Sequence, residues 1–169
     1  MSERHETGDV ASFNALAQEE AAARLTSCLG ARRWVDEVLA GRPYADLGSL
    51  LTRADVAARE LTDEDLDQAL AGHPRIGERA GQGHDAAFSA QEQSGVEASG
   101  PDVGARLIEG NRAYESRFGR VFLIRAAGRE AQEILTELER RLHNDPGTER
   151  QETVDNLREI ALLRLELVI

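Results

Sequence analysis

His73 is the residue whose type and setting best suit acid–base chemistry in this sequence. It is one of four histidines and the one held between Gly72 and Pro74, at the start of a glycine-rich stretch. Proline disfavours helical geometry at the residue before it, so we expect His73 on a loop just past a helix end. A rigid loop can fix an imidazole where a proton must be transferred. The alternative interpretation is an exposed loop histidine without a chemical role.

Glu92 and Arg164 could complement such a histidine. Glu92 follows Ser89 by three residues, so its carboxylate could serve a reaction or complete a capping box at a helix start. Arg164 lies among leucines in the last predicted helix, at the edge of its apolar stripe. An arginine in that position either extends to water or meets a buried anion.

A metal site formed by His73, Glu78, His84 and Asp85 is conceivable from the ligand types alone. Their spacing fits neither the helical H-E-x-x-H pattern of zinc enzymes nor a calcium-binding loop. Cys28 is the only cysteine, which excludes an internal disulfide and a cysteine-rich metal centre. We therefore expect no metal.

The basic residues narrow the range of cofactors. All 20 residues counted as lysine plus arginine are arginine, so the chain contains no lysine. Schiff-base chemistry through a lysine is excluded, and with it a lysine-linked pyridoxal phosphate enzyme. A P-loop is excluded too, because its phosphate-binding lysine is missing.

Composition and charge indicate a helical protein that acts on neither nucleic acid nor membranes. The chain has 169 residues, 41% of them hydrophobic but only 4% aromatic, and alanine, leucine and arginine dominate. This mixture favours an all-α single domain over a sheet. The net charge of -11 would repel phosphate backbones, and no apolar run is long enough to span a bilayer. The polar start of the chain predicts a cytoplasmic protein.

The apolar periodicity predicts a flexible N-terminus over residues 1–12 and one helical domain over residues 13–169. Helices are expected at residues 17–29, 34–39, 47–61, 64–71, 107–118, 129–143 and 149–168, with a short one starting at Ser89. Thr62 with Asp65 and Thr148 with Gln151 are expected to cap two of them. Glycine, serine and proline predict a connection from residue 95 to 104.

Residues 121–124 are the one segment that resembles a strand. The sequence Val-Phe-Leu-Ile has no second strand to pair with, so we expect a short extended segment near residues 121–125. Its backbone groups would need side chains, water or a ligand as partners, which makes it a candidate ligand-binding edge. A helical extension is the alternative.

Taken in order along the chain, several motifs resemble the OHCU decarboxylase family, in full 2-oxo-4-hydroxy-4-carboxy-5-ureidoimidazoline decarboxylase. The motifs are Phe13-Asn-Ala-Leu16, Arg32-Arg-Trp34, His73-Pro-Arg-Ile-Gly77, Ser89-Ala-Gln-Glu-Gln93, Phe118-Gly-Arg-Val-Phe-Leu-Ile124 and Leu162-Leu-Arg-Leu165. No single motif is specific, but the ordered set covers nearly the whole chain. The resemblance therefore predicts the fold as well as the chemistry.

The resemblance implies an all-helical bundle, free of metal and organic cofactor, that converts a ureido-imidazoline acid from urate degradation to (S)-allantoin. It implies that His73, Glu92 and Arg164 are the catalytic residues. It further implies that the ligand pocket is lined by Pro74, Ser89, Gln93 and the backbone of Phe122, Leu123 and Ile124. The protein would be a carboxy-lyase of purine metabolism, and the sequence leaves a homodimer open.

The substrate expected from the resemblance can supply its own electron sink. Its carboxylate and hydroxyl share a ring carbon beside a C=N bond, so that bond can accept the electrons released with carbon dioxide. We expect His73 to handle a proton, Glu92 to position the imidazole or the ureido group, and Arg164 to hold a substrate oxygen. Two rivals are a non-enzymatic acidic helical adaptor for a protein partner and a metal-assisted hydrolase on the same scaffold.

Overall fold

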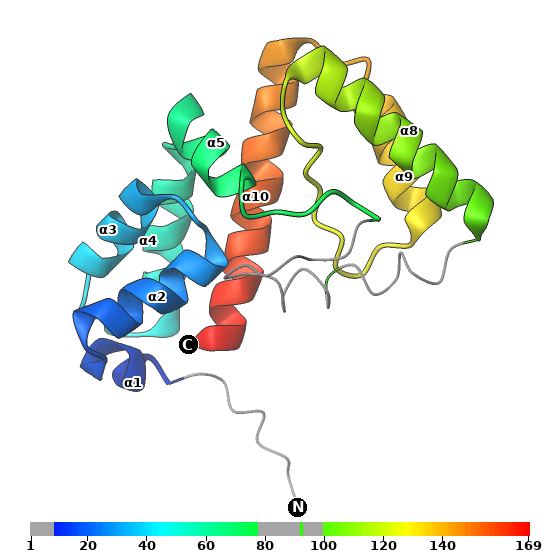
Figure 1. Cartoon of the computed structure of the whole chain (residues 1–169). Helices are drawn as coiled ribbons and strands as arrows, with labels where there is room; N and C mark the ends of the chain where they lie inside the picture. Colours follow the sequence, from blue (N-terminus) through cyan, green and yellow to red (C-terminus); the bar gives the residue numbers. More distant parts are fainter. Residues whose placement is uncertain (1–8, 78–91, 93–99) are drawn as a thin grey trace, which may run out of the picture.

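The computed structural model describes residues 9–77, 92 and 100–169, and in them the chain is all-α (Figure 1). The helices are α1 (Val10–Ala15), α2 (Gln18–Cys28), α3 (Arg32–Ala40), α4 (Leu47–Arg59), α5 (Asp63–Leu70), α8 (Pro101–Phe118), α9 (Ala131–Arg141) and α10 (Pro146–Val168). The described residues contain no β-strand, which confirms the predicted fold class. None of the described helices is long and apolar enough to cross a membrane.

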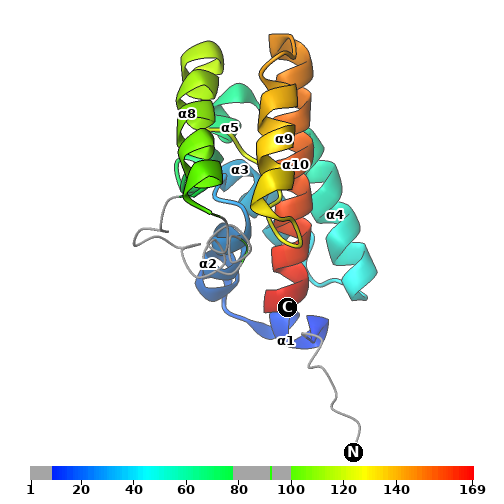
Figure 2. The same cartoon turned by 90° about the vertical axis from the view of Figure 1, so that its right-hand side faces the viewer.

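The larger hydrophobic core gathers around α10. This helix packs against α4 and α2, and α3 packs against both of those helices (Figures 1 and 2). The fully buried side chains of this larger core include Leu25, Trp34, Leu50, Leu157 and Leu165. Phe13 of α1 and the C-terminal Ile169 belong to the same core, and α1 lies near the C-terminal end of α10 (Figures 1 and 2).

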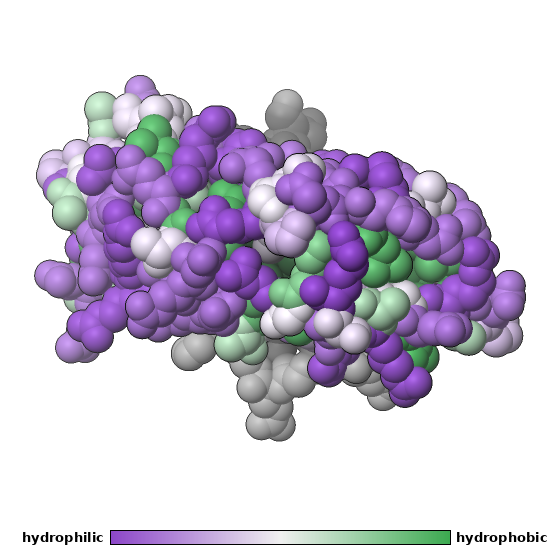
Figure 3. Space-filling model, turned by 90° about the horizontal axis from the view of Figure 1, so that it is seen from above, coloured by the Kyte–Doolittle hydropathy of each residue, from purple (hydrophilic) through white to green (hydrophobic). Residues whose placement is uncertain are grey.

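The smaller hydrophobic core lies mainly between α8 and α9, which pack along each other. The two helices approach closely at Gly110, where an added Cβ would lie 2.6 Å from Cδ2 of Leu138. Seen from above, hydrophobic side chains gather on the half of the molecule built by α8 and α9, whereas hydrophilic ones cover most of the other half (Figure 3).

Residues 121–126 form a non-helical segment between the two cores, so the prediction of an extended segment is confirmed and the helical alternative is wrong. Leu123 is buried in the larger core, whereas its neighbours Phe122 and Ile124 are buried in the smaller one. Successive side chains of an extended backbone point to opposite sides. An extended chain can therefore place neighbouring residues in different cores, which a helix could not do.

A buried ion pair joins α9 to the first turns of α10. The Arg141 and Glu149 side chains are only 1% and 3% exposed, and Nε of Arg141 donates to Oε1 of Glu149 over 2.9 Å. The Tyr114 hydroxyl of α8 donates to the same carboxylate, and Nδ2 of Asn144 donates to it over 3.1 Å. The charges are therefore saturated with hydrogen bonds in a site closed to water.

The helices α8 and α10 both begin earlier than the sequence predicts, and both have a proline at their start, Pro101 and Pro146. Asp145 caps α10 by accepting from the backbone N–H of Thr148 over 3.0 Å, so the predicted cap by Thr148 is wrong. Likewise α8 starts at Pro101, inside the predicted connection. Proline suits the first helical position because its missing N–H would have no partner there.

Of the other predicted boundaries, the start of α5 agrees with the structure and two differ from it by a few residues. The capping box of Thr62 and Asp65 is present at the start of α5. The helix α1 begins at Val10, three residues before the expected start of the domain at residue 13. The predicted helix at residues 129–143 is shorter in the structure, where α9 spans Ala131–Arg141.

We expect Arg141→Met to lower the free energy of unfolding by about 3–5 kcal/mol, because it leaves the buried Glu149 carboxylate without its cation. Urea unfolding followed by far-UV circular dichroism measures this loss. The matched control is Arg106→Met on α8, since Arg106 pairs with Glu139 while both side chains are about half exposed. That substitution should cost about 1 kcal/mol or less. Equal unfolding midpoints for the two variants would contradict the role given to the buried pair.

Candidate active site

His73 lies on a loop directly after α5, as the sequence predicts. Its backbone N–H donates to the carbonyl of Leu70 over 3.1 Å, which closes the last turn of the helix. Pro74 follows, and both residues are half buried. The imidazole is thus attached to the end of a packed helix, which restricts where it can move.

The rest of this loop is held against α8. Ile76 is buried in the smaller core, and its carbonyl accepts from Nδ2 of Asn111 over 3.1 Å. Nη2 of Arg75 donates to Oε2 of Glu115 over 3.2 Å. Gly77 has a φ of +90°, a conformation that side chains disfavour, and so permits the chain to turn after these contacts. His73 is therefore fixed from both sides, by α5 before it and by α8 after it.

Glu92 and Arg164 form a bidentate ion pair. Nε and Nη2 of Arg164 donate to the two carboxylate oxygens of Glu92 over 2.7 and 3.0 Å. The Arg164 side chain is 1% exposed and that of Glu92 is 20% exposed, so the carboxylate stands between the buried arginine and the outside. Arg164 therefore does not extend to water but meets an anion, as the second interpretation expects, although this anion is itself partly exposed.

Arg164 is also tied to the end of α2. Its Nη1 donates to the carbonyl of Ser27 over 3.3 Å. The neighbouring Cys28 is completely buried, and this burial raises the pKa of its thiol to about 12, although the positive charge of Arg164 acts in the opposite direction. A thiol protonated at neutral pH is a poor nucleophile. Cys28 therefore belongs to the packing beneath Arg164.

The segment 121–126 forms hydrogen bonds with side chains of two helices. Nη1 of Arg141 donates to the carbonyl of Leu123 over 2.7 Å, and the backbone N–H of Arg125 donates to Oδ1 of Asn156 over 3.0 Å. The side chains of Phe122, Leu123 and Ile124 are all buried. Packing in the two hydrophobic cores therefore occupies these three side chains.

Other predicted site residues are placed less completely. Pro74 is described beside His73, whereas Ser89 and Gln93 lie outside the described residues. Glu78, His84 and Asp85, which were considered as metal ligands with His73, also lie outside them. Within the described part of the chain, no group of three or more histidine, cysteine, aspartate or glutamate side chains is arranged to hold a metal ion.

Arg141, Asn111 and Asn156 support the site, and the sequence analysis missed all three. Each donates to, or accepts from, the backbone of a non-helical segment. A signal existed for Arg141, which follows the apolar position Leu138 on α9, and for Asn111, which follows Leu107 on α8. Each lies about one helical turn further along the buried face of its helix.

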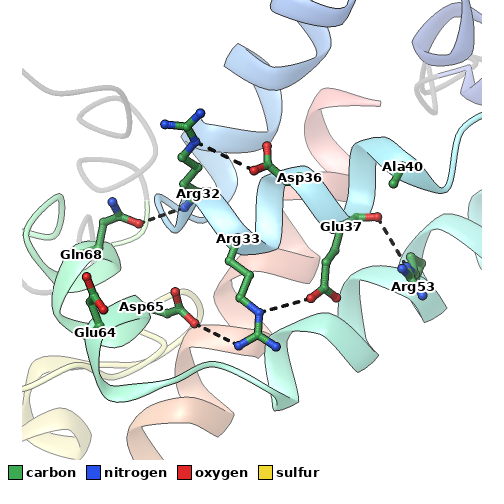
Figure 4. A pocket seen from close by; sticks show the side chains of 9 residues that line it. All are labelled: Arg32, Arg33, Asp36, Glu37, Ala40, Arg53, Glu64, Asp65 and Gln68. Carbon is green, nitrogen blue, oxygen red and sulfur yellow. Dashed lines mark hydrogen bonds and ion pairs between the residues drawn. The ribbon is translucent and has the colours of Figure 1, made fainter.

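A groove of about 570 Å³ lies elsewhere on the molecule, between α3, α4 and α5 (Figure 4). It is lined by Arg32, Arg33, Asp36, Glu37, Ala40, Arg53, Glu64, Asp65 and Gln68. Its charged side chains largely pair with one another, as Arg33 does with Glu37 over 3.4 Å and with Asp65 over 3.8 Å. None of the predicted site residues lines it, so we do not assign the chemistry to it.

The sequence is similar to several proteins of urate degradation. A profile of the OHCU decarboxylase family matches residues 14–166. The 2-oxo-4-hydroxy-4-carboxy-5-ureidoimidazoline decarboxylase of Amia calva is 32% identical over 147 residues, covering 78% of this chain and 77% of that protein. The protein of the same name from Haloferax volcanii is 28% identical, covering 78% of this chain and 79% of its own length.

Another relative is much longer than this chain. The uric acid degradation bifunctional protein of Bacillus sp. (strain TB-90) is 28% identical over 136 residues, and the match covers 79% of this chain but 26% of that protein. The similarity therefore concerns only a part of the bifunctional protein.

Solved structures agree with this relationship. A crystal structure of OHCU decarboxylase in the presence of (S)-allantoin has a TM-score of 0.73 and 23% identity, covering 85% of this chain and 94% of that one. A crystal structure of (S)-allantoin synthase has a TM-score of 0.69 and 16% identity, covering 94% of this chain and 53% of that one. The fold is shared in both cases. With the family profile matching nearly the whole sequence, the chain belongs to the OHCU decarboxylase family.

Proposed function

We propose that this chain decarboxylates 2-oxo-4-hydroxy-4-carboxy-5-ureidoimidazoline to (S)-allantoin in urate degradation, without a metal or an organic cofactor. Family membership supports the reaction class. The observation that carries the assignment to this site is the Glu92–Arg164 pair, which holds a partly exposed carboxylate on a buried arginine. Residues expected from the resemblance to act together are thus brought together from opposite parts of the sequence.

The reaction needs no electron sink from the protein. When the bond to the carboxylate breaks, its electron pair forms a C=C bond to the adjoining ring carbon, and the π pair of the C=N bond moves to nitrogen, which takes up a proton. The resulting enol then loses its hydroxyl proton and gains a proton on the ring carbon. The protein must orient the ring, stabilise the enol and deliver that proton to one face.

His73 is the group we assign to proton transfer, either from the hydroxyl or to the ring carbon. Glu92 would orient the imidazole or the ureido group. For Arg164, the bidentate contact favours action through Glu92 over the direct hold on a substrate oxygen that the sequence suggests. This division also suits the chemistry, since tight pairing with the departing carboxylate would stabilise the ground state as its charge disperses.

Neither rival interpretation gains support. An acidic helical adaptor would show no turnover, and family membership gives no reason to prefer it. A metal-assisted hydrolase would lose activity with chelators. The cytoplasmic location and the homodimer stay predictions from the sequence, since no observation on the described residues tests them.

We expect His73→Ala to keep its fold but to lose about 10²- to 10⁴-fold in kcat, the range typical of a positioned acid–base group. Circular dichroism of (S)-allantoin formation from freshly generated substrate, with release of carbon dioxide, measures the rate. His143→Ala is the control, because His143 lies in the turn after α9, two residues beyond Arg141, and is exposed. A His73→Ala variant as fast as the wild type would refute the assignment.

We expect the losses in kcat/KM from Glu92→Gln and Arg164→Met to be strongly non-additive, because the two side chains form one unit. The double variant should be little slower than the worse single variant in the same assay. Arg158→Met provides the control on the same helix. Arg158 forms its ion pair with Asp55 of α4, with 2.7 Å between Nη1 and Oδ1. Thermal unfolding of each variant separates lost activity from lost structure. Additive losses would show that Arg164 and Glu92 act independently.

A further inference from the structure

The backbone of residues 123–125 is held along one edge by two side chains from different helices. We propose that Asn156 is a positioning residue which, together with Arg141, holds the main chain of Ile124 where the resemblance to the family expects that backbone to meet the substrate. The inference rests on the proposed function, because it names the chain atoms that this site would offer to an amide or urea group. Asn156 itself would not touch the substrate.

The orientation of the Asn156 amide is well defined. Its Nδ2 donates to the carbonyl of Glu152 one turn earlier in α10, over 2.8 Å. This leaves Oδ1 to accept the N–H of Arg125 over 3.0 Å, at a half-buried position. The segment has no strand beside it among the described residues, so without Asn156 this N–H would lose its partner.

Arg141 holds the other point on the same edge. It donates to the carbonyl of Leu123 over 2.7 Å, and its guanidinium lies 4.6 Å from the centre of the Phe122 ring. Because Arg141 is itself bound to Glu149 in the core, it cannot follow a shift of the segment. The two contacts therefore fix the peptide groups on both sides of Ile124.

The geometry of an extended chain determines what remains for a ligand. The C=O of one residue and the N–H of the residue two positions later point to one edge, and the N–H and C=O of the residue between them point to the other. With Leu123 C=O and Arg125 N–H held by the protein, Ile124 presents a donor and an acceptor side by side on the opposite edge. Neither group of Ile124 is bonded to a described residue.

A donor beside an acceptor is the partner that a planar amide or urea requires, because such a group carries N–H and C=O next to each other. The ring and the ureido arm of the proposed substrate both contain groups of this kind. Two strands of an antiparallel sheet use the same reciprocal pair of hydrogen bonds. A shift of Ile124 would therefore weaken both bonds at once and impair binding more than proton transfer.

The test compares Asn156→Leu, which removes the acceptor, with Asn156→Asp, which keeps an oxygen for the N–H of Arg125. We expect Asn156→Leu to raise KM about tenfold with a smaller change in kcat and no change in the pH profile, and Asn156→Asp to recover most of the loss. The dissociation constant of (S)-allantoin, measured by calorimetry, should rise in parallel with KM. The control is Gln151→Leu, which removes an exposed amide from the same helix, where its Nε2 donates a hydrogen bond to Oδ1 of Asp155 over 3.1 Å.

The outcomes separate the inference from the proposed function. A wild-type enzyme that turns over, with KM for Asn156→Leu within twofold of the wild type, would overturn the inference alone. Equal impairment of Asn156→Leu and Asn156→Asp would do the same, because it would assign the effect to the lost donor toward Glu152. A wild-type protein that neither turns over nor binds (S)-allantoin would overturn both.

Discussion

The buried pair of Arg141 and Glu149 is the interaction on which the arrangement of the chain depends. Removing two charges from water is costly, and the cost is offset here because the polar atoms of the pair find partners from every neighbouring element. Tyr114 comes from α8, Asn144 from the turn after α9, and the carbonyl of Leu123 from the non-helical segment. One charged cluster therefore determines how three helices and the segment meet.

The long helix α10 carries this constraint to the candidate active site. Glu149 lies in its first turns and Arg164 near its end, 15 residues later, which is roughly 22 Å along a helix axis. The same rigid element thus anchors α9 at one end and Glu92 at the other, with Asn156 between them holding the segment. His73 is held separately, on a loop attached to α5 and α8. The site is assembled from parts that are each fixed in a hydrophobic core.

The periodicity of apolar residues was sufficient to predict most helices and the extended segment, and Pro74 with the glycines after it predicted the loop of His73, because each depends on local geometry. It failed at Pro101 and Pro146, where proline was interpreted as part of a turn although it occupies the first helical position. The partner of Arg164 could not be predicted either, because Glu92 is 72 residues away and ion pairs leave no periodic signal. Asn156 was missed since its partner is a backbone N–H, which every residue type other than proline offers equally.

The alternation of Phe122, Leu123 and Ile124 between the two cores has a consequence for the evolution of the family. Most connections on a protein surface tolerate the gain or loss of a residue. Here one inserted or deleted residue would move each side chain to the opposite side of the backbone and send Leu123 toward the wrong core. It would also exchange the edge facing Arg141 and Asn156 with the edge that Ile124 presents. In related sequences, alignment gaps should therefore avoid this segment even where its residue types change.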